Sequence, residues 1–583
     1  MASFGSNRRS GFVRTLAVIA VAGVAAAGWL YWRLGSQDAP RKEVVPAPAQ
    51  QPVETSAPSA KSGATPEKAT TEKAPVAPPP EVTRLTAPQL AAEIDKLFAA
   101  SWKEQQVAPA ATASDDEFLR RVYLDVTGKI PTAGEAKEFL DEKSSDKRAK
   151  LVVRLLDHAR FSNHLAVTLR ETLLPGADND PVKRNFVPGF EGWLRLRLSD
   201  GVPYDQLVRE LLTAKAEQAD PVGVVARRAP FGPEAFTLVH ESKPELLAGS
   251  SARALLGIQV QCAECHDHPF AEWKQEQFWS FAAFFVAPAA GATGVSTNAT
   301  LELEIPTKKT KVRPKFLDGQ SASFSSGNPM ERRQAIADWI IKNPGFARAA
   351  ANRVWWHFTG RGLVHPVDDM GTNNPASQPQ VLDLLAQQFR ANGYSFRYLC
   401  EAVAISNVYA RSSKPGPKSL EPTTFAVMPV RSMTPEQLYD SLMRAAFGRS
   451  TTFDSASSEA GLLMGDTQRT QFIRKFWEPV ERTGARGSIL HALALMNGNV
   501  LAAAVDPEKG TFLHAVLTSP FLDDAGRLET LYLATLTRRP TAAETAKLME
   551  HIKASAKDDA AKRKAFADVF WALLNSSEFA MAR

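Results

Sequence analysis

The stretch SDDEFLRRVYLDVTGKIPTAGEAKEFL, residues 114–140, carries two successive helix-start signals. Ser114 stands before the segment DDEFLRRVYLDV, and Thr132 opens the capping box TAGE before AKEFL. Both residue types accept hydrogen bonds from the backbone of a first helical turn. The stretch therefore predicts a helix, a short turn and a second helix.

The same signals recur along the chain. Thr86 stands before APQLAAEIDKLFAASW, and Thr434 stands before PEQLYDSLMRAAF, in which a proline occupies the first turn. Alternation with period two is rare, and its main exception is TNATLELEIPTKKTKVRPKF, residues 297–316. We therefore expect a mainly α fold, in which a small β insert separates two helical domains. The expected ranges are 85–286 for the first domain, 287–328 for the connector and 329–583 for the second domain.

Two segments far apart in the chain echo each other. VYLDVTGKIPTAGEAK, residues 122–137, and LYLATLTRRPTAAETA, residues 531–546, share Tyr, Leu, Pro, Thr, Ala and Glu at one constant offset. The shared pattern indicates either one helix, turn and capping box used twice, which we favour, or an ancient duplication.

The composition indicates a large globular protein. Of 583 residues, 44% are hydrophobic, which is enough for more than one core. The 69 basic and 63 acidic residues give a formal charge of only +6 and are interspersed along the chain. Because no stripe of lysine and arginine alternates with aromatic residues, the sequence does not indicate a nucleic-acid partner.

Residues 1–33 predict a membrane anchor. Arg8, Arg9 and Arg14 precede the uncharged run LAVIAVAGVAAAGWLYW, residues 16–32, which ends in aromatic residues typical of a membrane interface. Basic residues keep the preceding side in the cytoplasm, so we expect a single-pass inner-membrane protein whose bulk lies on the periplasmic, exported side. A signal peptide cleaved after the small residues 25–27 is the alternative, and it exports the same bulk of the chain.

Residues 34–84 predict a disordered tether. They are rich in Pro, Ala, Thr, Lys and Glu and contain no aromatic residue, so they cannot bury enough apolar surface to offset the entropy of ordering. A flexible chain of this length spans on the order of 40 Å.

The segment QCAECHDHPFAEWKQ, residues 261–275, contains the most specific motif of the chain. Cys262, Cys265 and His266 form Cys-x-x-Cys-His, and the whole sequence has only three cysteines. In an exported chain this motif is the attachment signature of c-type haem, in which two thiols add to vinyl groups and the adjacent imidazole becomes an axial iron ligand. We therefore expect one covalent haem c and a role in electron transfer or redox sensing with an envelope partner.

Three other interpretations of the motif remain open. The thiols and a histidine can belong to a zinc site, although no second pair at similar spacing is present. The thiols can form a redox dithiol, although the helical surroundings lack the βαβ context of thioredoxin-like proteins. They can also form a small structural disulfide or stay inert. The third cysteine, Cys400, lies on an apolar helical face and is expected in the core.

The chain near the motif offers no second axial ligand for the iron. We expect a more distant residue or an open coordination position, and we prefer His357, which lies among Trp355, Trp356 and Phe358. A histidine packed on a helix face is the plainer interpretation of the same residue. The other candidates are Met330, Met370, Met433, His240 and His365.

A polar cluster within residues 357–373 supports a rival hypothesis. Its imidazole and oxygen groups can hold a hydrolytic metal, which would make the protein an envelope hydrolase. We favour instead ion pairs that staple a loop, joining Arg353 and Arg361 to the two aspartates, and a non-catalytic envelope scaffold or binding module is the third hypothesis. The motifs of serine hydrolases, zinc proteases and phosphate-binding loops are absent from the sequence. The cluster consists of His357, Arg361, His365, Asp368, Asp369 and Asn373.

Four segments together carry a family resemblance: residues 118–140, 255–285, 351–370 and 570–579. The chain resembles the planctomycete cytochrome-C-like proteins, in which a domain with Cys-x-x-Cys-His precedes a second domain, filed as domains of unknown function fifteen-forty-nine and fifteen-fifty-three. The resemblance implies an envelope protein, often linked to secreted or sulfatase-like proteins, without an established activity. In one departure, the segment WHFT around His357 has one histidine fewer than the family pattern, which puts any function of paired histidines there in doubt.

Overall fold

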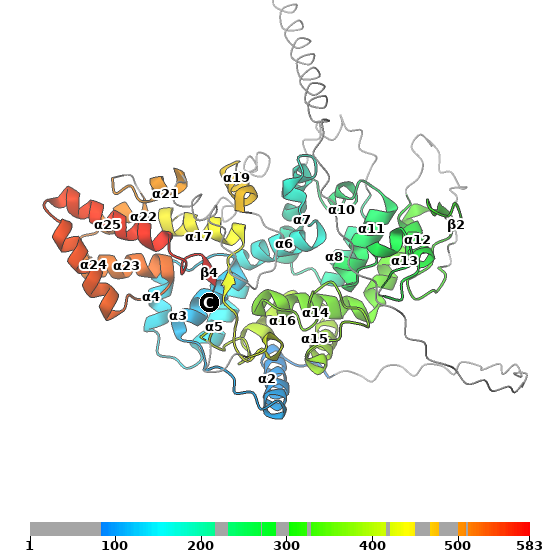
Figure 1. Ribbon diagram of the computed structural model, residues 1–583, viewed down its shortest axis with the longest axis horizontal. Helices are drawn as coiled ribbons and strands as arrows, with labels where there is room; N and C mark the ends of the chain where they lie inside the picture. Colours follow the sequence, from blue (N-terminus) through cyan, green and yellow to red (C-terminus); the bar gives the residue numbers. More distant parts are fainter. Residues whose placement is uncertain are drawn as a thin grey trace, which may run out of the picture. The chain divides into compact units, whose positions relative to one another are not determined.

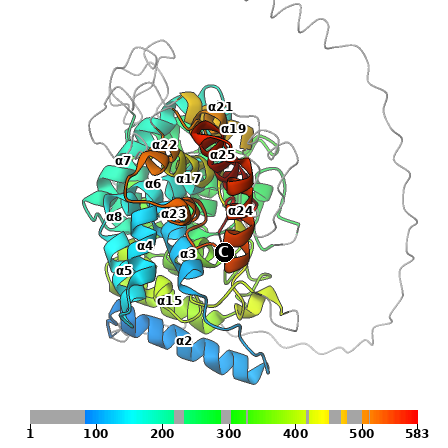
Figure 2. The same ribbon diagram turned by 90° about the vertical axis from the view of Figure 1, so that its left-hand side faces the viewer.

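The computed structural model describes residues 83–215, 231–269, 271–286, 302–322, 324, 328–414, 420–448, 467–476, 499–508 and 511–582 (Figure 1, Figure 2). The predicted anchor and all but the last two residues of the predicted tether lie outside this part of the chain. Within it, no helix combines the length and the apolar character that a membrane crossing requires.

Helices make up most of the described residues, which confirms the predicted mainly α fold (Figure 1). The first helices of the described chain are α2 (Ala87–Glu104), α3 (Asp115–Thr127), α4 (Ala133–Asp141), α5 (Lys147–Leu156), α6 (Ala159–Leu173), α7 (Val187–Ser199), α8 (Tyr204–Thr213), α10 (Ala235–Val239), α11 (Pro244–Ser251) and α12 (Gln275–Ala282). The later helices are α13 (Pro329–Lys342), α14 (Pro344–Thr359), α15 (Pro379–Ala391), α16 (Phe396–Ala404), α17 (Pro435–Phe447), α19 (Thr467–Phe476), α21 (Asn499–Ala504), α22 (Phe512–Thr518), α23 (Asp524–Leu536), α24 (Ala542–Ser555) and α25 (Asp559–Leu574).

The predicted helix starts are found where the sequence places them. Thr86, Thr132 and Thr434 each form a capping box, in which the threonine side chain accepts from the third helical residue and that residue's side chain binds back to the cap. Ser114 precedes α3 as expected, but its side chain makes no capping hydrogen bond. The three acidic residues of the first turn support this helix start instead, because carboxylates are favourable at the positive end of the helix dipole.

The predicted β insert contains one pair of short strands. Strand β1 (Leu303–Glu304) pairs antiparallel with β2 (Lys311–Val312), within the described part of the connector. A second pair was not predicted: β3 (Arg431–Ser432) runs antiparallel to β4 (Met581–Ala582). Two-residue strands carry no periodic signal, and their partners here lie far apart in the sequence, so local patterns do not reveal such a pairing.

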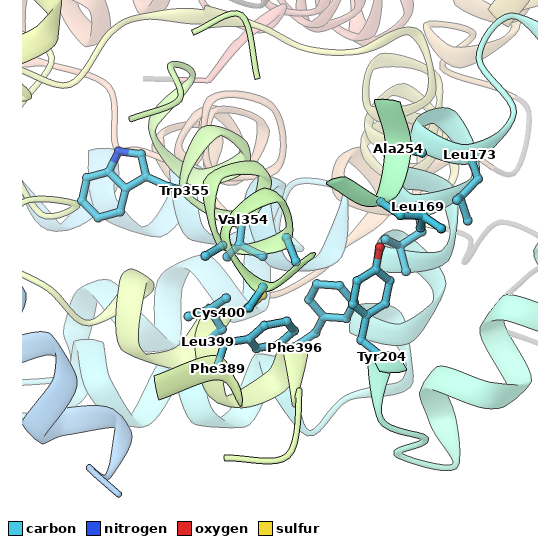
Figure 3. Close-up of a cluster of buried hydrophobic side chains, with 14 of the residues drawn as sticks. Leu169, Leu173, Tyr204, Ala254, Val354, Trp355, Phe389, Phe396, Leu399 and Cys400 are labelled. Atoms are coloured by element: carbon cyan, nitrogen blue, oxygen red, sulfur yellow. The ribbon is translucent and has the colours of Figure 1, made fainter. Parts of the chain in front are cut away.

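The packing does not follow the predicted division at residues 287–328. Residues 80–583 form one compact unit, and its larger core takes residues from both predicted domains, from Ala87 on α2 to Leu533 on α23. The smaller core is built from the last third of the chain together with Leu124 and Ile130. Helix α2 packs against α15 and α16. The apolar face of this helix from the first predicted domain is therefore covered by helices of the second, some three hundred residues later, and the two domains share one core. Figure 3 shows part of the larger core, including Trp355, Phe389, Phe396, Leu399 and Cys400.

A buried junction around Asp125 joins four segments. The Asp125 carboxylate accepts hydrogen bonds from Arg431 Nη2 at 2.7 and 3.0 Å and from the Tyr409 hydroxyl at 2.8 Å. Its backbone carbonyl accepts from His357 Nε2 at 2.7 Å, and Arg431 Nη1 donates to the His357 carbonyl at 2.8 Å. The side chains of Asp125 and Arg431 are only 2% and 4% exposed, so their charges depend on each other rather than on water.

Arg120, on the same helix as Asp125, ties the end of the described chain to α3. Its Nε donates to the Met581 carbonyl at 3.0 Å, and its Nη2 donates to the Phe579 carbonyl at 2.6 Å. Its Nη1 donates to the carbonyl of Thr535 at 2.9 Å, and Thr535 lies near the end of α23. Because Arg120 is 2% exposed, its donors are satisfied by these carbonyls and not by solvent.

The two echoing segments have the same local structure. In each, a helix ends at a residue with positive φ, Gly128 at 73° and Thr537 at 61°, and a capping box then starts the next helix. The expected reuse of one helix, turn and capping box is therefore confirmed, whereas the duplication stays a prediction. The first helix of the later copy, α23, packs against α4 of the earlier copy.

Candidate functional site

The Cys-x-x-Cys-His motif forms an exposed turn on a buried support. Residues Gln261–Glu264 form one turn of 3-10 helix, in which Ala263 is fully buried. Cys262, Cys265 and His266 are all exposed, and the two thiols are free. The backbone of the turn is thus anchored by its small apolar residue while the three predicted attachment residues face solvent.

Side chains of helix α12 hold this turn in place by hydrogen bonds. Gln275 is 1% exposed, and its side-chain amide donates to the carbonyls of Glu264 at 3.0 Å and Cys265 at 2.8 Å. The Trp279 indole Nε1 also donates to the Glu264 carbonyl, at 2.9 Å. Because these carbonyls are satisfied by buried side chains, the conformation of the turn is fixed independently of its thiols.

Helix α11 approaches the turn closely on another side. A Cβ atom added to Gly249 would meet the exposed Gln261 side chain at 2.8 Å, so a larger residue at this position would require that side chain to shift. The helices α11 and α12 also pack against each other (Figure 1). The turn therefore rests on two packed helices, and neither the Gln275 brace nor this close approach was recognised from the sequence.

His266 presents the nitrogen that a metal would bind. Its Nδ1 lies 2.7 Å from the Asp267 carbonyl. A carbonyl oxygen only accepts hydrogen bonds, so Nδ1 carries the proton and Nε2 keeps its lone pair. A hydrogen bond of this kind, from the ring nitrogen that does not bind the metal, fixes the tautomer and orientation of metal-binding histidines. The two exposed thiols and this imidazole fit the donor set that covalent haem attachment requires.

Asp267 links the motif to the start of α12. Its Oδ1 accepts from the Gln275 backbone N–H at 2.9 Å, and its Oδ2 lies 3.2 Å from Lys274 Nζ. These two contacts lower the pKa of the Asp267 carboxyl, the backbone hydrogen bond being the larger cause. The residue therefore stays ionised next to His266 and holds the end of the motif against the helix.

Cys400 and three aromatic residues that follow the motif lie in the core. Cys400 is 3% exposed on α16, and burial raises the pKa of its thiol to about 12, so the expectation of a core cysteine is confirmed. The aromatic residues after the motif, Phe278, Phe281 and Phe285, are also fully or almost fully buried. They belong to the larger core.

His357, the preferred second axial ligand, lies in the buried junction described above. Its Nε2 donates to the Asp125 carbonyl at 2.7 Å, and its ring centre is 5.3 Å from that of His164. Iron coordination through Nε2 would require this hydrogen bond to break. The assignment stays a prediction, and the structure gives His357 a packed and hydrogen-bonded position, which is the plainer interpretation.

The polar cluster at residues 357–373 does not gather around a metal. In the described parts of the chain, no group of three or more His, Cys, Asp or Glu side chains has a metal-binding arrangement. Arg353 donates to the carbonyls of Arg253 and Ala254 rather than pairing with an aspartate, so the expected staple is wrong in its partners. Asp368 lies instead near Gln259, at 3.2 Å, and Arg253, at 3.9 Å.

His240, another candidate ligand, is a buried neutral imidazole. Its Nδ1 lies 2.7 Å from the Phe236 carbonyl, and burial lowers its pKa to about 4, with Arg253 and Lys183 acting in the same direction. The unfolded chain, with a pKa near 6.5, binds this proton more readily than the folded chain does. Stability is therefore present above pH 6.5 and lost as the pH falls towards 4.

We expect His240→Asn to reduce the loss of stability at acid pH. Asparagine keeps a donor to the Phe236 carbonyl and does not titrate. The wild type should lose up to about 3 kcal/mol more unfolding free energy than the variant between pH 7 and pH 4. Urea unfolding at a series of pH values measures the difference. Parallel curves for the two proteins would contradict the buried neutral state.

Two family models match the chain, one after the other. A model named PSCyt2 and described as a protein of unknown function (DUF1549) matches residues 93–289, which include the Cys-x-x-Cys-His turn. A model named PSD1, a protein of unknown function (DUF1553), matches residues 332–483. Neither the search of curated proteins nor the search of solved structures found a match. The chain therefore belongs to the family in which a DUF1549 domain is followed by a DUF1553 domain.

Proposed function

We propose that this chain is an exported, membrane-tethered c-type haem protein that transfers electrons or senses redox state in the cell envelope. One covalent haem c would be held by Cys262, Cys265 and His266. The observation that carries the proposal is the braced turn, which exposes two free thiols and an imidazole whose Nδ1 is already bound. This arrangement supports haem attachment over a core role for the motif.

Each residue of the motif has a defined part in the attachment. When a cysteine thiol adds across a vinyl group, one carbon–sulfur bond forms and the thiol hydrogen passes to the neighbouring carbon. No atom leaves and no oxidant is needed. His266 would bind iron through Nε2, while the Asp267 carbonyl keeps the ring in orientation. The haem, when bound, supplies one-electron chemistry.

The exposure of the turn suits a partner protein rather than a buried substrate. Electron exchange requires the cofactor of each partner to come close, and an exposed turn imposes no narrow access path. The basic residues before the apolar run at residues 16–32 support export of the rest of the chain, with the inner membrane as its location. The stretch at residues 34–84 would let the folded part reach partners at a distance from the membrane.

Haem staining of a denaturing gel tests the proposal. We expect the full chain, expressed with a cytochrome c maturation system, to keep its haem through denaturation. The double variant Cys262→Ser/Cys265→Ser should lose the stain completely, because both carbon–sulfur bonds are gone. Cys400→Ala is the matched control and should keep it, since Cys400 is buried far from solvent.

The same stain reports on export, because maturation occurs only on the exported side. Removal of residues 1–33 should abolish staining while leaving both cysteines in place. Colourless wild-type protein, from cells in which a control cytochrome matures normally, would exclude the haem proposal. It would leave the dithiol, disulfide and zinc interpretations of the same three residues.

A further inference from the structure

Two consecutive arginines near the start of α13, Arg332 and Arg333, bring their guanidinium groups to one place. Arg332 Nη2 donates to the Val286 carbonyl at 2.8 Å, and the guanidinium carbon of Arg333 lies 4.9 Å from the centre of the Phe285 ring. Side chains of a helix lean towards its N-terminus, which lets both groups reach back from α13. Two positive charges therefore lie beside the same two residues, Phe285 and Val286.

Three nitrogen atoms of this pair are buried without a hydrogen-bond acceptor. Arg332 is 1% exposed, and its Nε and Nη1 have no hydrogen-bond partner among the residues that the structure describes. The same is true of Arg333 Nη1. Buried polar atoms in native proteins are nearly always paired with a protein group, a water molecule or an ion. The three nitrogens therefore point to an acceptor that the described chain does not supply.

The charges of the pair are also uncompensated within the described residues. Burial lowers the pKa of Arg332, and burial together with the neighbouring Arg332 lowers the pKa of Arg333 to about 10. A nearby carboxylate would act in the opposite direction. No described acidic group, not even the adjacent Glu331, raises either pKa. Both arginines stay protonated at neutral pH, so two like charges lie together.

The other buried arginines of the described chain show what such a group ordinarily receives. Four of them are paired with carboxylates at 2.7 or 2.8 Å, and Arg120 is held by several backbone carbonyls. Among the described residues, Arg332 has a single acceptor, the Val286 carbonyl. An anion would supply what this arginine lacks. The four pairs are Arg121–Glu117, Arg170–Glu191, Arg431–Asp125 and Arg444–Glu135.

Two adjacent guanidinium groups suit a doubly charged oxyanion. Each group offers a planar fork of N–H donors that matches the oxygens of a phosphate or a sulfate. One divalent anion neutralises both charges, whereas a chloride or a single carboxylate neutralises only one. Arg333 is only half-buried, so the pair borders the surface from which a small ion can bind.

We propose that Arg332 and Arg333 form a binding site for a doubly charged oxyanion, a phosphate or a sulfate group. The arginines stand at the start of the region matched by DUF1553, residues 332–483, and Val286 stands near the end of the region matched by DUF1549, residues 93–289. An anion bound here would neutralise the charges where these two regions meet, and would stabilise their contact. The site uses no residue of the Cys-x-x-Cys-His turn, so its test does not depend on haem.

Calorimetric titration of the full chain with sodium phosphate and with sodium sulfate tests the site. The pH is slightly alkaline, where phosphate is mainly divalent, and sodium chloride holds the ionic strength constant. We expect binding at one site per chain, and the anion that binds more tightly identifies the ligand group. Arg332→Met and Arg333→Met should each weaken this binding at least tenfold, about 1.4 kcal/mol. Lys342→Met, which removes the same charge from an exposed position of α13, is the matched control and should change it less than twofold.

Thermal unfolding in chloride shows whether each variant is folded. Arg332→Met should stay folded, because it removes a buried charge that no described carboxylate compensates. The proposal is overturned if neither phosphate nor sulfate binds below about 10 mM. It is equally overturned if folded Arg332→Met and Arg333→Met bind as the wild type does, or if Lys342→Met weakens binding as much as they do.

Discussion

Asp125→Ala is expected to lower the free energy of unfolding by about 3 to 5 kcal/mol. The substitution removes the carboxylate that accepts from Arg431 and Tyr409, and it leaves the Arg431 guanidinium buried at 4% side-chain exposure. A buried charge without its partner cannot recover its hydration, so the full desolvation cost appears as lost stability. Chemical unfolding followed by circular dichroism measures the loss.

Asp338→Ala is the matched control for this substitution. Asp338 also pairs with an arginine, Arg209, but both side chains are nearly half exposed, at 46% and 45%. Its loss should cost less than about 1 kcal/mol. The double variant Asp125→Leu/Arg431→Met should be more stable than Asp125→Ala, because it removes both charges together. Equal losses for Asp125→Ala and Asp338→Ala would show that burial does not decide the strength of the pair.

Trp355→Ala is expected to cost about 3 to 5 kcal/mol through a different mechanism. Trp355 is fully buried, stacks on Phe98 with ring centres 5.4 Å apart and meets the edge of Phe425 at the same distance. Trp355 belongs to the larger core (Figure 3). Its removal leaves a cavity there, because close-packed neighbours relax only partly into the space. Thermal and chemical unfolding should both report the loss.

Trp355→Phe should cost clearly less than Trp355→Ala. The phenyl ring keeps most of the contact area, and it removes the indole Nε1, which has no hydrogen-bond partner among the described residues. Trp571→Ala, at a position that is 38% exposed on α25, is the surface control and should cost less than about 1 kcal/mol. If Trp571→Ala cost as much as Trp355→Ala, packing at Trp355 would not be the cause.

The helices could be predicted because their signals are local. Thr132 and Glu135 lie three residues apart, and the capping box that they form depends on no other part of the chain. The cores could not be placed in the same way. Leu124 joins the smaller core with residues of the last third of the chain, although it lies within the first predicted domain. Periodicity shows that a helix has an apolar face, but not which helix covers it.

The candidate site, too, has a part that the sequence reveals and a part that it does not. The motif of Cys262, Cys265 and His266 is continuous in sequence, so its residue types and spacing could be recognised directly. The Gln275 brace depends on tertiary contacts, which local sequence patterns do not show. Charged residues within otherwise apolar helices, such as Asp125 in VYLDVT, were the available signal for buried ion pairs.

The hydrogen bonds of Arg120 have a consequence for synthesis. Its acceptors at Phe579 and Met581 follow it by 459 and 461 residues. At about 5 to 20 residues per second, a ribosome needs roughly 20 to 90 seconds to produce that interval. During this time α3 has been made, but the two carbonyls that accept hydrogen bonds from Arg120 do not yet exist. The hydrogen bonds that hold Arg120 of α3 can therefore form only after residue 581 has been synthesised, so this part of the fold is completed late in the making of the chain.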